Sequence, residues 1–219
     1  MSGTGRSQVQ RLPERGSQDP AVIKEVLDAA FVAHVGFHAQ SQTFVIPMIY
    51  GREDDILYLH GATSSRLLGT LTERTDACVT VTIIDGLVLA RSAFHHSVNY
   101  RSVVAFGTAR ALRGAATKVR AMNVISEHLL AGRWRDVRGP TRSEVDATSV
   151  IEFTITEASA KIRTGPPVDA DEDYGRPTWA GVLPFRLQAD APMPDPRLAA
   201  DIAIPEYLVS SKNAPDRQT

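Results

Sequence analysis

Short runs in which apolar and polar residues alternate place the strongest constraint on the fold of this chain. Ala77–Ile84 shows the pattern best, because every second side chain is apolar and would line one face of a strand. Asp85-Gly86 follows, a preferred pair for a two-residue hairpin turn, so Leu87–Arg91 is expected to return antiparallel. Strands joined by hairpins and interrupted by single helices favour a closed antiparallel barrel with flanking helices over a parallel sheet.

Other runs of the same kind predict further strands. They lie at Phe31–His38, Thr43–Tyr50, Ile56–His60, Tyr100–Leu112 and Ser149–Ile162. Pro47 falls inside one of them, and since proline cannot donate to a sheet ladder it marks an edge, a bulge or a gap that faces a ligand. Gly107 predicts a bulge or a bend of the barrel.

Helix signals and composition divide the chain into three parts. Asp19 can cap a helix that Pro20 begins and that runs to about Ala30. A short helix is expected up to residue 71, and a longer one from about 116 to a stop at Gly132. The sequence thus predicts a flexible N-terminal segment, 1–18, a barrel domain, 19–186, and an irregular C-terminal tail, 187–219.

Composition excludes several kinds of partner. Lys and Arg number 24 against 25 Asp and Glu, a balance without general attraction to nucleic acid or to an anionic membrane. Cys78 is the single cysteine, so an internal disulfide is impossible and a reducing compartment is expected. The N-terminus lacks the apolar stretch of a secretion signal, and no window approaches the roughly 20 apolar residues of a membrane span. We therefore expect a cytoplasmic protein.

A glycine and hydroxyl residues between a strand and a helix form the most informative segment. Backbone N–H groups at a helix start attract phosphate, and Gly61 frees the backbone there. Ser64, Ser65 and Arg66 would add short donors and a bidentate charge, with a further hydrogen bond from His60. The simpler alternative is a capped helix with a surface arginine.

Three other segments allow both a structural and a functional interpretation. His95 and His96 are neighbours that point to opposite faces of a strand, so no metal site is predicted. The run 161–163, Lys-Ile-Arg, is either a solvated strand end or a basic contribution near an anionic cofactor. Trp179 begins an apolar island that either anchors the tail to its own subunit or contacts a ligand or a partner subunit.

Common signatures of other binding sites and of hydrolases are missing from the sequence. It has no G-x-G-x-x-G after a strand, no P-loop and no nucleophile elbow. Catalytic residues are not assigned. His60 and Tyr100 are candidates only because they can donate protons beside a bound cofactor.

Six motifs in their order along the chain resemble the pyridoxamine 5′-phosphate oxidase-like superfamily, in particular its flavin-nucleotide-binding branch related to nitroimidazole reductases. The resemblance extends from about Arg11 to Pro184. The motifs are Arg11-x-Pro13-x-Arg15, His34-Val35-Gly36-Phe37, Val45-Ile46-Pro47-Met48, Leu57-Tyr58-Leu59-His60-Gly61 with Ser65-Arg66, Tyr100-Arg101-Ser102-Val103-Val104 with Gly107, and Trp179-Ala180-Gly181.

The resemblance implies a mainly β fold, the six-stranded antiparallel FMN-binding split barrel, in a homodimer with two FMN sites between its subunits. It places the phosphate at His60, Ser64, Ser65 and Arg66, and it places the flavin ring along the backbone of Ile46, Pro47 and Met48. Ser102 falls where related oxidases make a polar flavin contact, and Trp179 resembles a tryptophan that reaches the flavin from the second subunit.

The function expected on this basis is an FMN-dependent oxidoreductase. It would act on a small molecule or take electrons from a donor such as NADH or NADPH, with the flavin ring transferring electrons or hydride. One alternative is the same fold with a deazaflavin or haem in the groove. Another is a flavin carrier or sensor without turnover, since no clear acid–base constellation is present.

Overall fold

The computed structural model describes residues 5–64, 66–71 and 74–209, without the side chains of residues 66 and 67. Two compact units divide the chain, Met1–Phe185 and Arg186–Thr219. The sequence places this boundary one residue later, between 186 and 187, and its division into domains stays a prediction. In the second unit the described part forms short turns and one helix, α6 (Glu206–Val209). No described helix is long and apolar enough to cross a membrane.

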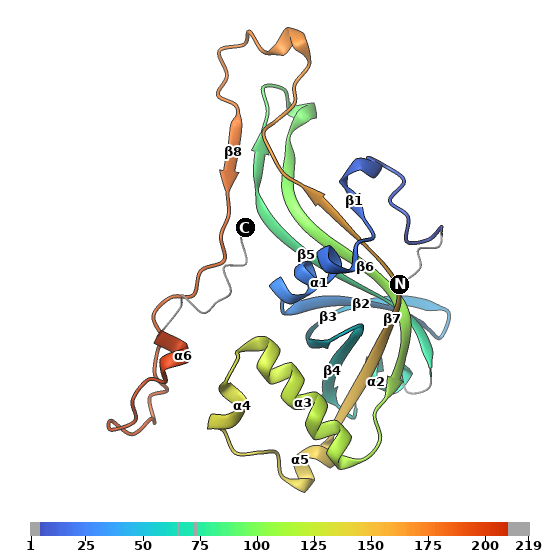
Figure 1. The fold of residues 1–219 in the computed structure, drawn as a ribbon, viewed down its shortest axis with the longest axis vertical. Helices are drawn as coiled ribbons and strands as arrows, with labels where there is room; N and C mark the ends of the chain where they lie inside the picture. The colour runs from blue at the N-terminus through green and yellow to red at the C-terminus, as the bar shows by residue number, and fades with distance from the viewer. Residues whose placement is uncertain (1–4, 65, 72–73, 210–219) are drawn as a thin grey trace. The chain divides into compact units, whose positions relative to one another are not determined.

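Six antiparallel strands of the first unit close into a ring (Figure 1). The ring order is β2-β5-β6-β7-β4-β3, and β1 and β8 pair outside it with β7 and β5. The six-stranded antiparallel split barrel predicted from the sequence is therefore confirmed. The strands are β1 (Gly16–Ser17), β2 (Val32–Ala39), β3 (Gln42–Glu53), β4 (Ile56–Ala62), β5 (Thr75–Leu89), β6 (Ser97–Ala111), β7 (Thr148–Arg163) and β8 (Gly181–Pro184).

Alternation along the strands separates the barrel core from its outside. On β5, Val79 and Val81 are buried while Cys78 and Thr80 are half-buried on the opposite side, as the sequence pattern predicts. The core is filled mostly by aliphatic side chains, and the aromatic rings of Phe37, Tyr50 and Phe153 pack between them. Burial raises the pKa of the Cys78 thiol, which keeps it protonated and favours a structural over a reactive cysteine.

Helix α1 (Pro20–Ala29) starts as its sequence predicts. The Asp19 carboxylate accepts a hydrogen bond of 2.8 Å from the backbone N–H of Ala21, and Pro20 occupies the first turn. Its apolar face, Ile23, Val26 and Leu27, is buried in the same core as the strands. The helix therefore contributes directly to the barrel interior.

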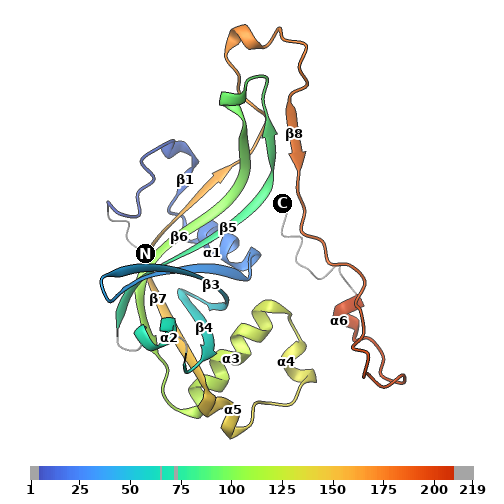
Figure 2. The same ribbon diagram turned by 180° about the vertical axis from the view of Figure 1, so that it is seen from behind.

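Helix α3 (Ala115–Leu129) packs against β3 and β4 (Figure 2). At Gly51 a Cβ atom would lie 2.5 Å from the Cα of Ile125, so only glycine allows the helix backbone to come this close. The helix predicted to stop at Gly132 ends three residues earlier, at Leu129, and Gly132, with a φ of 89°, is the residue before α4. Shorter helices are α2 (Arg66–Thr70), α4 (Arg133–Asp136) and α5 (Arg142–Ala147).

Two predictions about strand irregularities have different outcomes. Asp85-Gly86 is not a hairpin turn, because β5 continues through it to Leu89 with a shift of register between Ile84 and Gly86. Asp85 forms a bidentate ion pair with Arg101, and a Cβ at Gly86 would lie 2.7 Å from the carbonyl oxygen of Leu183 on β8. Both contacts favour a bulge over a turn. The bulge predicted at Gly107 is confirmed by a second shift of register.

Residues 5–18, for which the sequence predicts flexibility, lie along β7 in the structure. Gly16 pairs with Lys161, and Lys161 donates a hydrogen bond of 2.7 Å from Nζ to the carbonyl oxygen of Arg11. Arg6 pairs with Glu157 and stacks over the ring of Phe106 at 4.8 Å. These contacts join residues 100 to 151 positions apart in the chain.

Candidate cofactor site at the split of the barrel

The barrel opens between β3 and β4. The ladder between these strands covers only Tyr50–Glu53 and Ile56–Leu59, whereas β3 pairs with β2 over its whole first half. Within the described chain, residues 42–49 of β3 therefore have a strand on one side only. His60, Gly61 and Ala62 of β4 likewise continue past the ladder and pair with β7 alone. The open backbone edge of β3 and the end of β4 form the two sides of the split.

Ile46, Pro47 and Met48 lie on the open edge of β3, where the resemblance places the flavin ring. Ile46 and Met48 pack against the barrel core, and Pro47 points outward and is exposed. Of the three interpretations of Pro47, a sheet edge is confirmed, because a residue without an N–H is tolerated where no strand follows. Backbone groups along this edge are free of ladder partners and suit the polar rim of a planar ligand.

The other side of the split carries the predicted phosphate-binding segment. His60 is the first residue of β4 beyond the ladder and is half-buried, and Ser64 is exposed in the turn before α2. Leu68 of α2 would lie 2.9 Å from a Cβ at Gly61, so this glycine lets α2 pack onto the strand end. Ser65 and the side chain of Arg66 lie outside the described residues, although α2 begins at Arg66.

Burial lowers the pKa of His60 below its ordinary value of 6.5. The unfolded chain then binds this proton at a higher pH than the folded protein does, so the contribution of His60 to stability falls as the pH drops through 6.5. We expect an NMR titration of its ring to have a midpoint below 6.5 and the His60→Gln variant to lose less stability below that pH. A midpoint above 6.5 would contradict this environment.

Ser102 lies on the same side of the sheet as Pro47 but not beside it. We name this solvent side the outer face. The Oγ of Ser102 donates a hydrogen bond of 3.2 Å to the carbonyl oxygen of Lys161. Strands β2 and β5 lie between Ser102 on β6 and the open edge of β3. Residues of the outer face are Val32, His34, Val45, Pro47, Ile49, Thr80, Thr82, Ile84, Tyr100, Ser102 and Val104.

His34 is a residue of this face to which sequence reasoning gave no role. The register places it directly opposite Pro47 on β3 and opposite Thr80 on β5, and its side chain is exposed. The tight turn at Gln40 and Ser41 was the signal that could have found it. Such a turn fixes which residues of two strands lie opposite each other.

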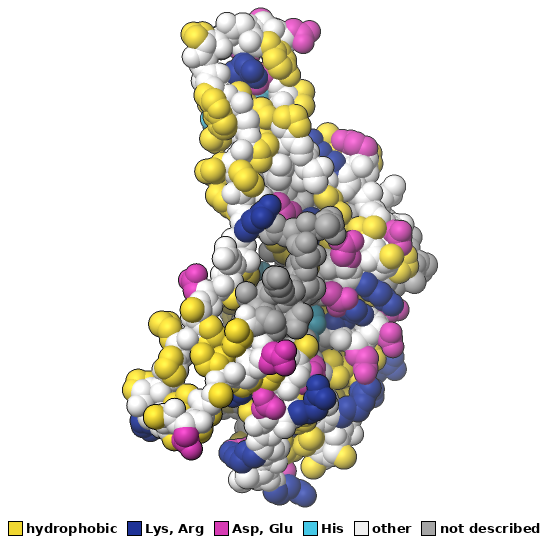
Figure 3. Space-filling view, turned by 60° about the vertical axis from the view of Figure 1, so that its left-hand side comes forward, with side chains coloured by type: hydrophobic (Ala, Val, Ile, Leu, Met, Phe, Trp, Pro, Cys, Tyr) yellow, Lys and Arg dark blue, Asp and Glu magenta, His cyan; other side chains and the backbone are white. Residues whose placement is uncertain are grey.

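Trp179 is not brought to the split within one chain. It lies on an arm, residues 86–99 and 164–185, in which β5, β6 and β8 extend past the barrel (Figure 1). Its side chain is 69% exposed and its ring lies against Gly181. Figure 3 shows apolar side chains gathered on this arm, where Phe94 and Val168 are also exposed. A flavin contact by Trp179 therefore requires a second subunit.

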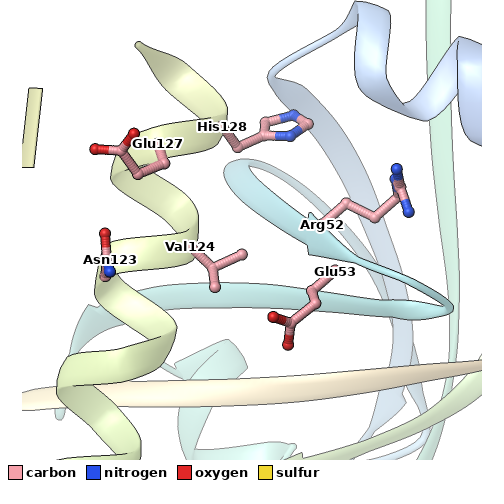
Figure 4. A pocket seen from close by; sticks show the side chains of 6 residues that line it. All are labelled: Arg52, Glu53, Asn123, Val124, Glu127 and His128. Carbon is pink, nitrogen blue, oxygen red and sulfur yellow. The ribbon is translucent and has the colours of Figure 1, made fainter. Parts of the chain in front are cut away.

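A hollow outside the split lies between α3 and the end of β3 (Figure 4). Arg52 at its wall forms a bidentate ion pair with Asp28, and Glu127 accepts hydrogen bonds from the N–H groups of Gly132 and Trp134. Its charged groups already have structural partners. It contains none of the residues that the sequence predicts for the site.

A second group on the arm has the composition of a cation site. Ligand atoms of His95, Asp169 and Asp173 lie within 4.8 Å of one another. Asp169 accepts hydrogen bonds from Arg91 and from the N–H of Ser92, and Asp173 pairs with Arg176. These arginines already balance the two carboxylates, and the group serves to hold the arm together.

A barrel of this topology, open along half of one strand, defines the split-barrel class of proteins. The model of the family described as pyridoxamine 5′-phosphate oxidase matches residues 19–162. The chain belongs to this family, as the motifs of the sequence indicate. No curated protein sequence matches the chain.

Solved structures add similarity over nearly the whole chain. The flavocytochrome Anf3 of Azotobacter vinelandii is 40% identical, with 94% of this chain and 96% of that one covered and a TM-score of 0.88. An FAD- and haem-binding protein of Mycobacterium smegmatis is 33% identical, with 90% and 97% covered and a TM-score of 0.85. A candidate 5-nitroimidazole antibiotic resistance protein of Bacteroides thetaiotaomicron shares the fold, at 20% identity, with 67% and 86% covered and a TM-score of 0.55.

Proposed function

We propose that this protein is a flavin-binding redox protein that holds the flavin ring on the outer face beside the open edge of β3. The split of the barrel carries the proposal, because it combines a strand edge that no described strand covers, an apolar surface and a half-buried imidazole at one place. These groups fit a planar ring with a polar rim. The names of the two relatives above 30% identity support a redox cofactor.

The two possible flavins, FMN and FAD, share the part that the split would bind. The sequence predicts FMN, and the Mycobacterium smegmatis relative is named for FAD. Both contain the same ring, ribityl chain and first phosphate, which the predicted segment at Ser64, Ser65 and Arg66 would hold. We propose FMN as the group recognised at the split, either alone or as the flavin half of FAD.

Haem is a second candidate ligand. The Mycobacterium smegmatis relative is named for haem, and flavocytochrome is the name of the other relative. His34 is an exposed imidazole on the outer face that is available to a ligand there. His96 suits this role less, because its Nδ1 accepts a hydrogen bond of 3.0 Å from the N–H of Ala90. We propose that haem, where bound, serves alongside the flavin.

A homodimer completes the proposed site. The outer face exposes apolar side chains, with Val45 at 63% and Ile84 at 46% exposed, and such a surface suits a contact with a second copy. The arm is long enough to leave the barrel and carries Trp179 at a distance from its own split. We propose that it reaches the partner's flavin, as the resemblance implies.

The roles of the protein's own groups are binding and orientation. A bound flavin supplies the electron or hydride transfer, as a cofactor does in this class of protein. The edge of β3 would align the ring, and His60, held neutral by burial, can donate or accept one hydrogen bond. We propose oxidoreductase activity with a small-molecule substrate or a donor such as NADPH in the cytoplasm.

The test is to identify what copurifies with the protein. We expect mass spectrometry and the absorption spectrum to show a flavin, and sedimentation to show a dimer. Reduction of the bound flavin by NADH or NADPH in stopped-flow mixing supports the enzyme, whereas a flavin that no donor reduces supports a carrier or sensor. A deazaflavin, or a protein without flavin that cannot be reconstituted, would overturn the proposal.

A further inference from the structure

Arg163 at the end of β7 is a buried cation that has no acidic partner among the described residues. Arg163 is only 7% exposed, and its guanidinium donates hydrogen bonds to Asn99 Oδ1 and to the carbonyl oxygens of Gly165 and Pro166. All three acceptors are neutral. Burying a charge is unfavourable unless an opposite charge or strong hydrogen bonds compensate it.

Other arginines at least partly covered by the fold have carboxylates. Arg52 pairs with Asp28, Arg101 with Asp85 and Arg91 with Asp169. Carboxylates thus neutralise these three arginines locally. Among the described residues no carboxylate does the same for Arg163, whose acceptors are all neutral.

Two more cations lie beside Arg163. Gly16 pairs directly with Lys161, which places Arg15 next to the last residues of β7. Burial lowers the pKa of Arg163, and the nearby charge of Arg15 lowers it further. Arg15 and Lys161 are both half-buried, and neither forms an ion pair with any described residue. Three positive charges thus lie near one another, and none of them forms an ion pair with a described residue.

A hollow of about 390 Å³ lies next to the pairing of Gly16 with Lys161, although the three cations themselves are not part of its wall. It lies between the N-terminal segment and β7, with Pro13, Gly16, Ser17 and Ser159 in its wall. Its described lining contains no charged residue of either sign, and the hydroxyls of Ser17 and Ser159 suit a polar ligand. The hollow and the three cations therefore lie at the same end of β7, where Gly16 pairs with Lys161.

This place is distinct from the predicted phosphate segment of the same subunit. Ala62 at the end of β4 pairs with Thr148, and Lys161 lies thirteen residues further along β7. At about 3.3 Å per residue in an extended strand, the two places are roughly 40 Å apart along β7. One phosphate cannot occupy both within one chain.

We propose that Arg15, Lys161 and Arg163 form an anion site that binds the doubly charged acidic group of a cofactor. Two groups of this chemistry are available under the proposed function, on which their identity rests: the phosphates of a flavin nucleotide and the paired propionates of haem. Arginine forks and a lysine ammonium bind both kinds of oxygen anion. The ligand supplies the charge that Arg163 lacks.

The experiment compares Arg15→Gln and Lys161→Gln with the wild-type full-length protein. Each protein is titrated separately with FMN, FAD, haem and inorganic pyrophosphate at constant low ionic strength. We expect affinity for at least one of these probes to fall about tenfold or more in both variants, since each loses a charge-assisted contact. Arg135→Gln removes an exposed cation of α4 and serves as the matched control, with unchanged affinities.

Stability separates a binding role from a structural one. Because like charges repel, both variants should melt no lower than the wild-type protein in the absence of ligand. Arg163→Lys, which keeps the charge, should retain more affinity than Arg163→Gln. A loss confined to flavin and pyrophosphate assigns the site to phosphate, and a loss confined to haem assigns it to propionate.

The failures are distinguishable. Affinities for all four probes within twofold of wild type in both variants overturn the anion site, even if flavin binds well and the proposed function stands. Pyrophosphate binding that depends on Arg15 and Lys161, in a protein that binds neither flavin nor haem, overturns the proposed function and keeps the site. A wild-type protein that binds none of the probes overturns both.

Discussion

Gly51→Ala is expected to destabilise the barrel by about 3 kcal/mol, at the upper end of the usual range for overpacking. The added Cβ would lie 2.5 Å from the Cα of Ile125 and 2.6 Å from its backbone nitrogen. A side chain in the way can change its rotamer, but the backbone of a helix cannot. Helix α3 would therefore have to move away from β3, and with it the buried side chains of Ala121 and Ile125.

Equilibrium unfolding in urea measures this loss of free energy. Thermal unfolding should show the melting temperature falling by roughly 6–12 °C for a chain of this size. Gly139→Ala is the matched control, since no atom lies within 4 Å of a Cβ built at that exposed glycine. Its stability should stay within about 0.5 kcal/mol of wild type. A Gly51→Ala protein as stable as the control would show that α3 does not pack on β3 at this distance.

Arg66→Ala is expected to weaken flavin binding by roughly 10- to 150-fold, because a hydrogen bond to a charged group contributes about 1.5–3 kcal/mol. Arg66 begins α2 four residues after Ala62, the last residue of the strand that ends at the split. The sequence predicts the phosphate at this helix start. Arg66→Lys keeps the charge but loses the bidentate fork, so an intermediate affinity is expected.

Fluorescence titration with FMN and FAD measures the change, and Arg113→Ala, an exposed arginine after β6, is the control. Equal affinity in the Arg66→Ala variant and wild type would place the flavin phosphate elsewhere. Combined with the variants of Arg15 and Lys161, the result assigns the phosphate to one end of β7 or the other.

Local signals predicted the parts of the fold that depend on near neighbours. Asp19 and Pro20 act within one helical turn, and the alternation of Ala77–Ile84 depends only on which side of the strand is buried. The six strands of the ring and the bulge at Gly107 could be predicted for the same reason. The prediction at Asp85-Gly86 was wrong because its preferred turn competes with contacts to Arg101 and to β8, which is about a hundred residues away.

The candidate site was predictable in composition but not in arrangement. Motifs named the residues of β3, β4 and β6, yet they do not show that Pro47 and His34 lie opposite each other or that Trp179 lies on an arm, which the strand register establishes. The group of Arg15, Lys161 and Arg163 depends on the pairing of Gly16 with Lys161, a contact across 145 residues that no periodicity reveals.

Pro47 has a consequence for the protein before any ligand arrives. The closed ring leaves few strand edges exposed, and the first half of β3 is one of them in the described chain. Exposed edges invite strands of other molecules to add on and start aggregates, and a proline interrupts such addition because it offers no N–H. The residue at the centre of the opening thus also keeps newly made chains from joining edge to edge.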